Sequence, residues 1–250
     1  GGVVIVPFLL AMSVDMRYAI GAALVSVIAT SSGAAAAYVK EGYTNMRVGM
    51  FLEMATTFGA LCGAYLGTRV LPTSAIAVVF GLVLLGSAWL SFRKREDHLA
   101  DRPDPLATRL RLDGGYPTPA GWQTYHVQRV PIGFGLMYVA GVLSGLLGIG
   151  SGAVKVLALD QAMQIPFKAS TTTSNFMIGV TAAASAGLYL HDGYISPSLS
   201  MPVMLGILPG ALLGSKLLTR TKVAALRVVF GIVIAALAVQ MIYLGLTGRA

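Results

Sequence analysis

The sequence predicts an all-α polytopic membrane protein with two inverted-topology repeats, each a glycine-broken re-entrant hairpin plus three transmembrane helices. Three observations lead to this prediction. Of the 250 residues, 56% are hydrophobic and 11% are charged, whereas soluble domains carry about 25% charged residues. Apolar runs close to bilayer length recur along the whole chain. The two halves also share residues at a fixed spacing, which indicates an internal duplication.

The apolar segments set the order of the predicted helices. They span residues 1–12, 19–39, 46–69, 73–92, 131–149, 153–164, 169–190, 197–219 and 222–246. Most are separated by short turns containing Gly, Pro, Asp or Asn. Residues 93–130 are charged, contain four prolines and are too poor in apolar residues for an independent domain. We therefore expect an N-terminal repeat at 1–92, a cytoplasmic loop at 93–130 and a C-terminal repeat at 131–250. No methionine or basic leader opens the chain, so we also expect residues upstream of Gly1.

The duplication rests on matches at one offset. Within residues 42–69, ten of 28 positions are identical to the residue 151 places further on. The matches include Met50 with Met201, 41–43 (EGY) with 192–194 (DGY), 59–61 with 210–212 (both GAL) and, at an offset of 150, 78–81 with 228–231 (both VVFG). Membrane composition favours chance matches of Gly, Ala and Leu, but it does not explain the paired Tyr, Met and Arg.

Charge distribution separates inverted from parallel repeats. If the segment 131–164 enters and leaves by one face, each half crosses three times and the repeats are inverted. With 93–130 inside, that arrangement puts 13 basic residues inside and 3 outside. If 131–164 crosses once, the repeats are parallel and the count is 10 against 6. The positive-inside rule favours the inverted arrangement, although residues 131–147 alone approach a full crossing at about 1.5 Å per residue.

Two glycine ladders predict close helix packing. Gly59, Gly63 and Gly67 are spaced four apart, and the second half repeats this spacing at Gly206, Gly210 and Gly214. Small residues at this spacing let another helix approach closely in lipid. The ladders are therefore predicted packing seams, either between the two halves or between protomers of a homodimer.

A glycine break at Gly148, Gly150 and Gly152 predicts a substrate site. Gly1 and Gly2 are its counterparts at the start of the chain. Non-helical backbone at membrane depth is tolerated where protein or a water-filled cavity covers it. A half-helix that begins there points free N–H groups into the cavity, which suits an anion. The alternative is a glycine kink that serves packing alone. Under the first interpretation Gly150, Ser151 and Gly152 bind substrate together with Gly1 and Gly2.

Lys155 follows this break by about one helical turn. An isolated ammonium at the centre of a membrane helix costs about 2.5–3.5 kcal/mol. The re-entrant interpretation places Lys155 nine residues from the segment end at 164, about 13 Å deep, whereas a lysine near an interface would snorkel. Asp160 lies five residues further on, off the same helix face. The sequence therefore favours an anionic substrate over a structural salt bridge as the partner of Lys155.

A polar run opens the next helix and completes the candidate site. Residues 169–175 (ASTTTSN) carry five hydroxyls and an amide. Some of these groups cap the helix or bond back to the preceding turn. Asn175, at about 9 Å inside the membrane, needs partners. We include Thr172, Thr173, Ser174 and Asn175 in the predicted site, which as a set of donors suits an oxyanion. The first half has no matching polar set, so the site is asymmetric.

The remaining residues give weaker indications. Glu53 lies inside an apolar segment and is either a proton carrier or a residue of the cytoplasmic interface near Arg47. His191 and Asp192 lack further metal ligands at suitable spacing. The sequence contains no Walker loop, HExxH or GxSxG pattern, which argues against an enzyme or an ATP-driven pump in this chain. We expect no cofactor, no metal and no nucleic-acid partner.

The glycine and hydroxyl motifs together resemble the sulfite exporter TauE/SafE family of membrane transporters. The resemblance rests on residues 1–7 (GGVVIVP), 19–26 (AIGAALVS), 144–152 (SGLLGIGSG), 169–174 (ASTTTS) and 210–214 (GALLG). It covers nearly the whole chain and implies a transporter in the bacterial inner membrane that moves sulfite, sulfonates or related small anions outward. Carried over by position, the glycine turns and the 173–175 stretch would line the substrate pathway. Ala22, Ala23, Ser151, Val154, Lys155 and Leu157 depart from the family's usual pattern.

The sequence thus favours a secondary transporter that exports small organosulfur anions, such as sulfite and sulfoacetate, by alternating access. A passive anion channel or uniporter would use the same residues. A non-transporting membrane scaffold would use the glycine ladders as its interaction surface.

Overall fold

The computed structural model describes residues 2–40, 42–92, 104–118, 121–218 and 223–248. The first half contains helices α1 (Gly2–Ala11), α2 (Met16–Lys40), α3 (Met46–Tyr65), its π-helical continuation η1 (Leu66–Val70), and α4 (Thr73–Phe92). The segment between the halves contains α5 (Pro105–Arg109) and strands β1 (Gly114–Thr118) and β2 (Gly121–Tyr125). The second half contains α6 (Val130–Leu147), α7 (Gly152–Leu157), its continuation η2 (Ala158–Ala162), α8 (Phe167–His191), α9 (Pro197–Leu218) and α10 (Val223–Thr247).

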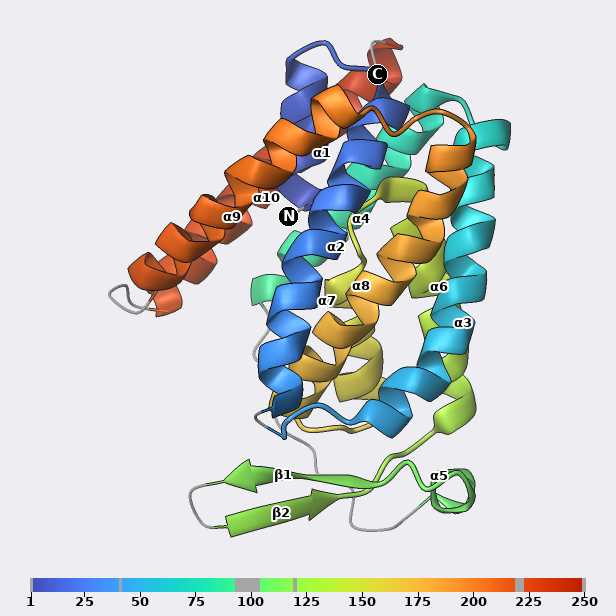
Figure 1. Cartoon of the computed structure of the whole chain (residues 1–250), viewed down its shortest axis with the longest axis vertical. Helices are drawn as coiled ribbons and strands as arrows, with labels where there is room; N and C mark the ends of the chain where they lie inside the picture. The colour runs from blue at the N-terminus through green and yellow to red at the C-terminus, as the bar shows by residue number, and fades with distance from the viewer. Residues whose placement is uncertain (1, 41, 93–103, 119–120, 219–222, 249–250) are drawn as a thin grey trace.

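The described chain is mostly helical, as expected of an all-α membrane protein, and each predicted apolar segment forms a helix with ends within a few residues of the predicted ones. Among the described residues, Met46–Val70 and Val130–Leu147 have the length and composition of membrane-crossing helices. Shorter apolar helical stretches occur at Gly2–Ala11, Thr73–Trp89, Pro197–Ile207 and Gly231–Thr247. Helices α2, α3, α6 and α8 lie side by side along the long axis, whereas α9 and α10 slant across it (Figure 1).

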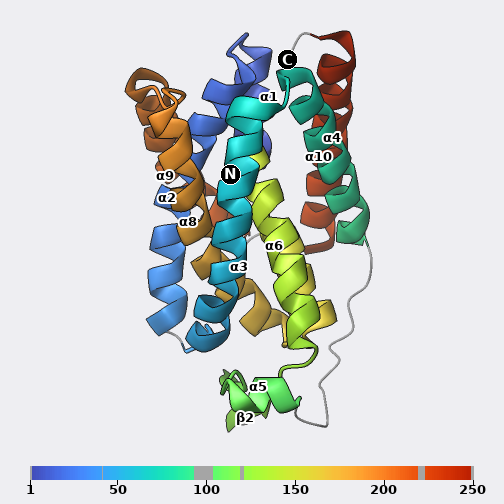
Figure 2. The same ribbon diagram turned by 90° about the vertical axis from the view of Figure 1, so that its right-hand side faces the viewer.

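The segment between the halves contains more structure than a surface loop. Strands β1 and β2 pair antiparallel from Gly114↔Tyr125 to Thr118↔Gly121. Together with α5 they lie at one end of the helices (Figures 1 and 2). This segment packs against α3, η2 and α6 through four buried apolar side chains: Ala107, Leu112, Tyr125 and Val127.

Asn45, just before α3, holds this segment by side-chain hydrogen bonds. Its Nδ2 donates to the Leu112 carbonyl at 2.9 Å and to the Tyr125 hydroxyl at 3.0 Å. Its Oδ1 caps α3 by accepting from Val48 N at 3.1 Å. Burial raises the pKa of the Tyr125 phenol to about 12. One amide side chain therefore fixes both the start of α3 and the β-hairpin.

Helices α6 and α7 form a hairpin. Gln128 N donates to the Met163 carbonyl at 3.0 Å, so the chain returns to the level at which α6 began. The turn at its tip uses left-handed backbone at Gly148 (φ 67°), Gly150 (φ 68°) and Ser151 (φ 44°). Glycine adopts this conformation without steric cost, whereas a residue such as Ser151 stores about 1–2 kcal/mol. The glycine break therefore marks a reversal of chain direction.

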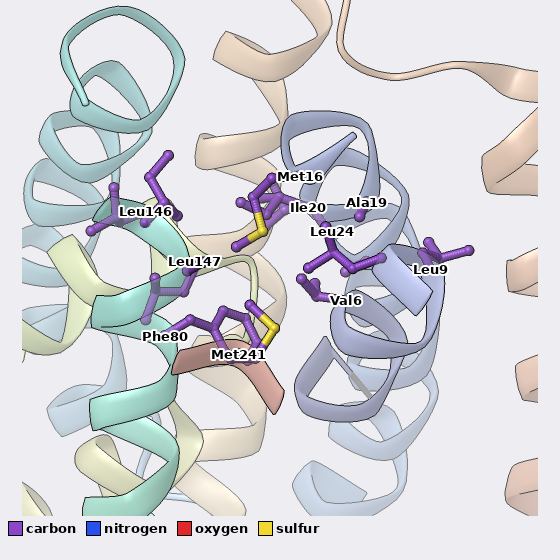
Figure 3. Packing of buried hydrophobic residues seen from close by; sticks show 14 of the residues in the cluster. Val6, Leu9, Met16, Ala19, Ile20, Leu24, Phe80, Leu146, Leu147 and Met241 are labelled. Atoms are coloured by element: carbon purple, nitrogen blue, oxygen red, sulfur yellow. The ribbon is translucent and has the colours of Figure 1, made fainter. Parts of the chain in front are cut away.

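Helices from the two halves pack against each other in pairs. Helix α2 runs antiparallel to α8, because Gly21 lies against the Tyr194 carbonyl and Gly179 against Ser31 Oγ. Helix α4 runs antiparallel to α10, because Gly81 lies against Ile242 and Gly245 against the Ser74 carbonyl. Figure 2 shows α4 beside α10 and α3 beside α6. The buried cluster in Figure 3 likewise joins the halves, with Val6 and Ile20 on one side and Leu147 and Met241 on the other.

The ladder in α3 is a seam between the halves. A Cβ at Gly59 would lie 2.2 Å from the Tyr138 carbonyl oxygen, and one at Gly63 would lie 2.0 Å from that of Val142. From α6, Gly141 and Gly145 approach α3 equally closely. Such distances leave no room for a side chain, so backbone packs on backbone. The ladder of α9 differs, since an added Cβ at Gly206 or Gly210 would meet no atom of the described residues within 4 Å. The side-chain surroundings of Gly214 lie outside the described residues.

Candidate functional site

Three buried polar side chains from three helices meet inside the bundle. Lys155 of α7 is 0% exposed, and its Nζ donates to Thr181 Oγ1 of α8 at 2.5 Å. Thr181 Oγ1 lies 2.6 Å from Glu53 Oε1 of α3 and 2.8 Å from the Met177 carbonyl. A hydroxyl has one proton to donate, so with Lys155 as donor, Thr181 donates either to Glu53 or to Met177. When it donates to Glu53, the nearer of the two acceptors, the hydroxyl bridges an ammonium and a carboxylate.

Glu53 is 6% exposed, and its two carboxylate oxygens differ in their surroundings. Oε1 accepts from Thr181 and, at 3.4 Å, from Thr57. Oε2 is buried and has no hydrogen-bond partner among the described residues. Glu53 and Lys155 interact electrostatically across the hydroxyl. Because a buried charge is costly unless it is paired, each of the two stabilises the other. Of the two roles considered for Glu53, the interfacial one is wrong.

Local sequence explains why these groups meet. The glycine seam draws α6 and α3 together, and α6 leads into the turn at Gly148. The turn starts α7 within the bundle, so Lys155, three residues after Gly152, is carried to the interior. On α8 the buried face recurs at helical spacing through Ser174, Met177 and Thr181. Thr181 lies on this face two turns beyond the polar run at 172–175.

The glycine turn at 148–152 also meets its counterpart at the start of the chain. Gly2, at the start of α1, packs so closely against the turn that an added Cβ would lie 2.3 Å from the Gly148 carbonyl oxygen. Ser151, which precedes α7, is 3% exposed, and its hydroxyl has no partner among the described residues. The hydroxyl of Ser144, on the last turn of α6, is equally buried and unpartnered. Both buried hydroxyls are therefore left able to donate a hydrogen bond next to the glycine turn.

The run at 172–175 is not brought to the ammonium of Lys155. Thr172 bonds to the Lys168 and Ala169 carbonyls of its own helix. Thr173 Oγ1 accepts from Asn45 N at 3.0 Å. Thr173 lies eight residues, or about 12 Å, from Thr181 along α8.

Ser174 and Asn175 lie nearer to the glycine turn. The Ser174 hydroxyl bonds to the Thr171 carbonyl, and Asn175 is half-buried. One turn further along α8, Ile178 packs on the turn, since an added Cβ at Gly150 would lie 2.9 Å from Ile178 Cγ2. Both residues therefore lie about one helical turn from this contact. Gly1 lies outside the described residues. That these residues bind substrate stays a prediction.

The chain matches the sulfite exporter TauE/SafE family over residues 1–241. It belongs to this family. The probable membrane transporter protein YunE of Bacillus subtilis is 25% identical over an aligned length of 255 residues. The alignment covers 98% of this chain and 91% of the relative. YdhB of the same organism, also a probable membrane transporter protein, is 26% identical over 86% of this chain and 80% of its own length. A probable membrane transporter protein of Xylella fastidiosa is 25% identical over 90% and 79%. No solved structure matches the chain.

The family establishes a membrane-embedded transporter and confirms the resemblance found in the sequence. Within it, the fold brings together residues that the sequence pattern left apart. Thr181 and Ser144 were missed, although Thr181 continues the buried face of Ser174 and Met177. Glu53 was a weaker candidate, although a carboxylate within an apolar membrane helix is itself a functional signal.

Proposed function

We propose that this chain is a secondary transporter that exports small organosulfur anions, such as sulfite and sulfonates including sulfoacetate, by alternating access. The observation that carries the substrate class is the match of residues 1–241 to a family described as sulfite exporters. Lys155, a fully buried cation close to a break in the backbone, fits an anion-conducting interior.

Alternating access requires two halves that can rock against each other, and inverted repeats provide them. The antiparallel pairing of α2 with α8 and of α4 with α10 supports an inverted relation, because each pair contains helices that match at the 150–151 offset. The return of the chain between Gln128 and Met163 supports a re-entrant hairpin. We place the protein as a multi-pass protein in the bacterial inner membrane, with residues 93–130 on the cytoplasmic side.

The proposed anion site surrounds the meeting point of the glycine breaks. The N–H groups of Gly150, Ser151 and Gly152 and the buried Ser151 hydroxyl are donors, and Lys155 supplies the charge. Gly1 and Gly2 border the site from α1. Thr172, Thr173, Ser174 and Asn175 line the approach along α8. These donors suit an oxyanion.

Counterflow in proteoliposomes tests the proposal. Vesicles containing the full chain are assayed with sulfite, sulfoacetate, taurine, thiosulfate and carboxylates. We expect exchange of the sulfur oxyanions and its loss in Lys155→Met, which keeps the side-chain volume. Lys168→Met is the matched control, because Lys168 is exposed and bonds to the Tyr43 hydroxyl. Exchange of wild-type rate in Lys155→Met would reject the site.

The same vesicles separate the other functions. Flux that follows the membrane potential without coupling to another ion would indicate a passive channel or uniporter. No flux and no binding of any anion would indicate a non-transporting scaffold, with the glycine ladders as its interaction surface.

A further inference from the structure

The proposed anion site leaves Glu53 without a role. Its carboxylate is 6% exposed, and its Oε2 has no hydrogen-bond partner in the part of the chain that the structure describes. The Thr181 hydroxyl, 2.6 Å from Oε1, links it to the only group proposed to neutralise the substrate, Lys155. A second anion, internal to the protein, thus already stands at the cation that a substrate needs.

The positions related by the internal offset carry no charges. An offset of 151 places Glu53 on Met204 and Lys155 on Val4, whereas Thr181 falls on Thr30. Both positions are apolar there, and Val4 is 47% exposed where Lys155 is fully buried. A buried ion pair is often no more stable than well-packed apolar residues. The presence of Glu53 and Lys155 as a pair therefore calls for a reason other than stability.

Other ionisable groups on the packed helices lie far from Glu53 or are otherwise engaged. Helix α6 carries Tyr138, which interacts with Cys62. On α8, Lys168 and His191 lie 13 and 10 residues from Thr181, or about 20 and 15 Å along the helix, and Tyr189 bonds to the Leu146 carbonyl. The carboxylate of Asp160, in η2, lies near Gln161 Nε2. Lys155 is therefore the charged group linked to Glu53.

We propose that Glu53 binds the proton that is transported with the anion, and that its protonation releases Lys155 for the substrate. This inference rests on the proposed function. With Glu53 ionised, Thr181 bridges a neutral carboxylate–ammonium pair. When Glu53 takes up a proton, Lys155 loses its counter-charge, and a monovalent anion restores it. The buried cluster carries no net charge in either state, which keeps both states accessible at membrane depth. One proton and one anion then move together without net charge, so export is driven by the outward gradient of the anion and must exceed the opposing gradient of the proton.

This linkage fixes how affinity depends on pH. Where Glu53 is ionised in the empty protein, each anion that binds must take up one proton, so affinity falls about tenfold for each unit of rising pH. In Glu53→Gln the amide cannot ionise and Lys155 stays available. We expect anion affinity in this variant to be independent of pH and, at alkaline pH, higher than in the wild type.

The experiment uses the purified full chain and methanesulfonate, which remains a monoanion throughout the physiological range of pH. Calorimetric titration gives the affinity at each pH, and an indicator dye in weak buffer gives the protons taken up per anion. Ser185→Ala is the matched control, because Ser185 is buried on the same face of α8 and bonds to the Thr181 carbonyl of its own helix. We expect about one proton per anion in the wild type and Ser185→Ala, and none in Glu53→Gln.

The outcomes distinguish failure of the role of Glu53 from failure of the proposed function. Anion binding without proton uptake in the wild type would overturn the role of Glu53 and leave the proposed function intact. A tenfold slope retained in Glu53→Gln would also overturn it. The absence of counterflow for every anion of the panel would reject the proposed function and this inference together. If Glu53→Gln does not fold, the wild-type proton count alone decides, and Thr181→Val, which removes the bridge, supplies the second measurement.

Discussion

Replacing Gly145 with alanine tests whether backbone contact between α3 and α6 holds the two halves together. An added Cβ there would lie 2.0 Å from the Ala60 carbonyl oxygen and 2.9 Å from Ala64 N. Ordinary contacts begin at 3.4 Å. The helices would have to move apart by about 1.4 Å at this point, and the neighbouring contact at Gly141 would loosen with it.

The expected loss of stability follows from this displacement. Overpacking of a close-packed contact costs about 1–3 kcal/mol, and a gap of about 1 Å forfeits up to half of the dispersion energy of the atoms that line it. Lipid supplies no hydrophobic force to restore the contact. Gly135 of the same helix is exposed, and an added Cβ there would meet nothing within 4 Å. Its replacement by alanine should leave stability unchanged or raise it by up to about 1 kcal/mol.

Unfolding by sodium dodecyl sulfate in mixed micelles, followed by circular dichroism, measures both variants. Gly145→Ala should unfold at a lower detergent fraction than the wild type, and Gly135→Ala at an equal or higher one. Equal midpoints for the two variants would refute the argument that close backbone contact at this seam stabilises the fold.

Two further changes test the ends of the bundle. Asn45→Asp keeps the oxygen that caps α3 but loses the donors to Leu112 and Tyr125, so it should lower stability by about 1–3 kcal/mol and speed proteolysis within 104–125; unchanged proteolysis would contradict this. The Arg69 guanidinium bonds to Asp192 and holds the pKa of that carboxyl below its ordinary value of 3.8. Because the pKa of Asp192 is lower in the folded protein than in the unfolded chain, its ionised carboxylate stabilises the fold at any pH above the unfolded-state pKa, and this stabilisation is lost as the pH falls through the folded-state pKa. Asp192→Asn should therefore unfold more easily than the wild type at neutral pH and match it in strong acid. A stability difference that does not depend on pH would count against the ion pair.

Much of the fold could be predicted because its signals are local. Apolar length sets each membrane helix, since the bilayer leaves backbone groups no other partners. Gly148 and Gly150 marked a change of direction because a positive φ favours glycine at such a turn. Helix α5 and strands β1 and β2 were missed, because Leu112 and Tyr125 are buried by contacts with Asn45 and α3 rather than by a local pattern.

Some residues of the candidate site could likewise be predicted from local signals, and others could not. Lys155 and the glycine turn stood out in the sequence because a cation and a broken backbone are costly at membrane depth. Thr181 did not, because a threonine in a membrane helix can bond to its own preceding turn and needs no partner elsewhere. Its bonds to Lys155 and Glu53 join residues 26 and 128 positions apart.

The sequence by itself determined the class of protein, the helical segments and the places where glycine breaks or tightens the packing, and it predicts the duplication. These follow from composition and spacing along one chain. The tertiary structure decided that the α3 ladder packs on α6, that Gly2 meets the turn at Gly148, and that the ammonium of Lys155 lies against Thr181 and Glu53. The reason is physical: a buried charge in a helix shows that a partner must exist, but which helix supplies the partner depends on long-range packing that no local pattern encodes.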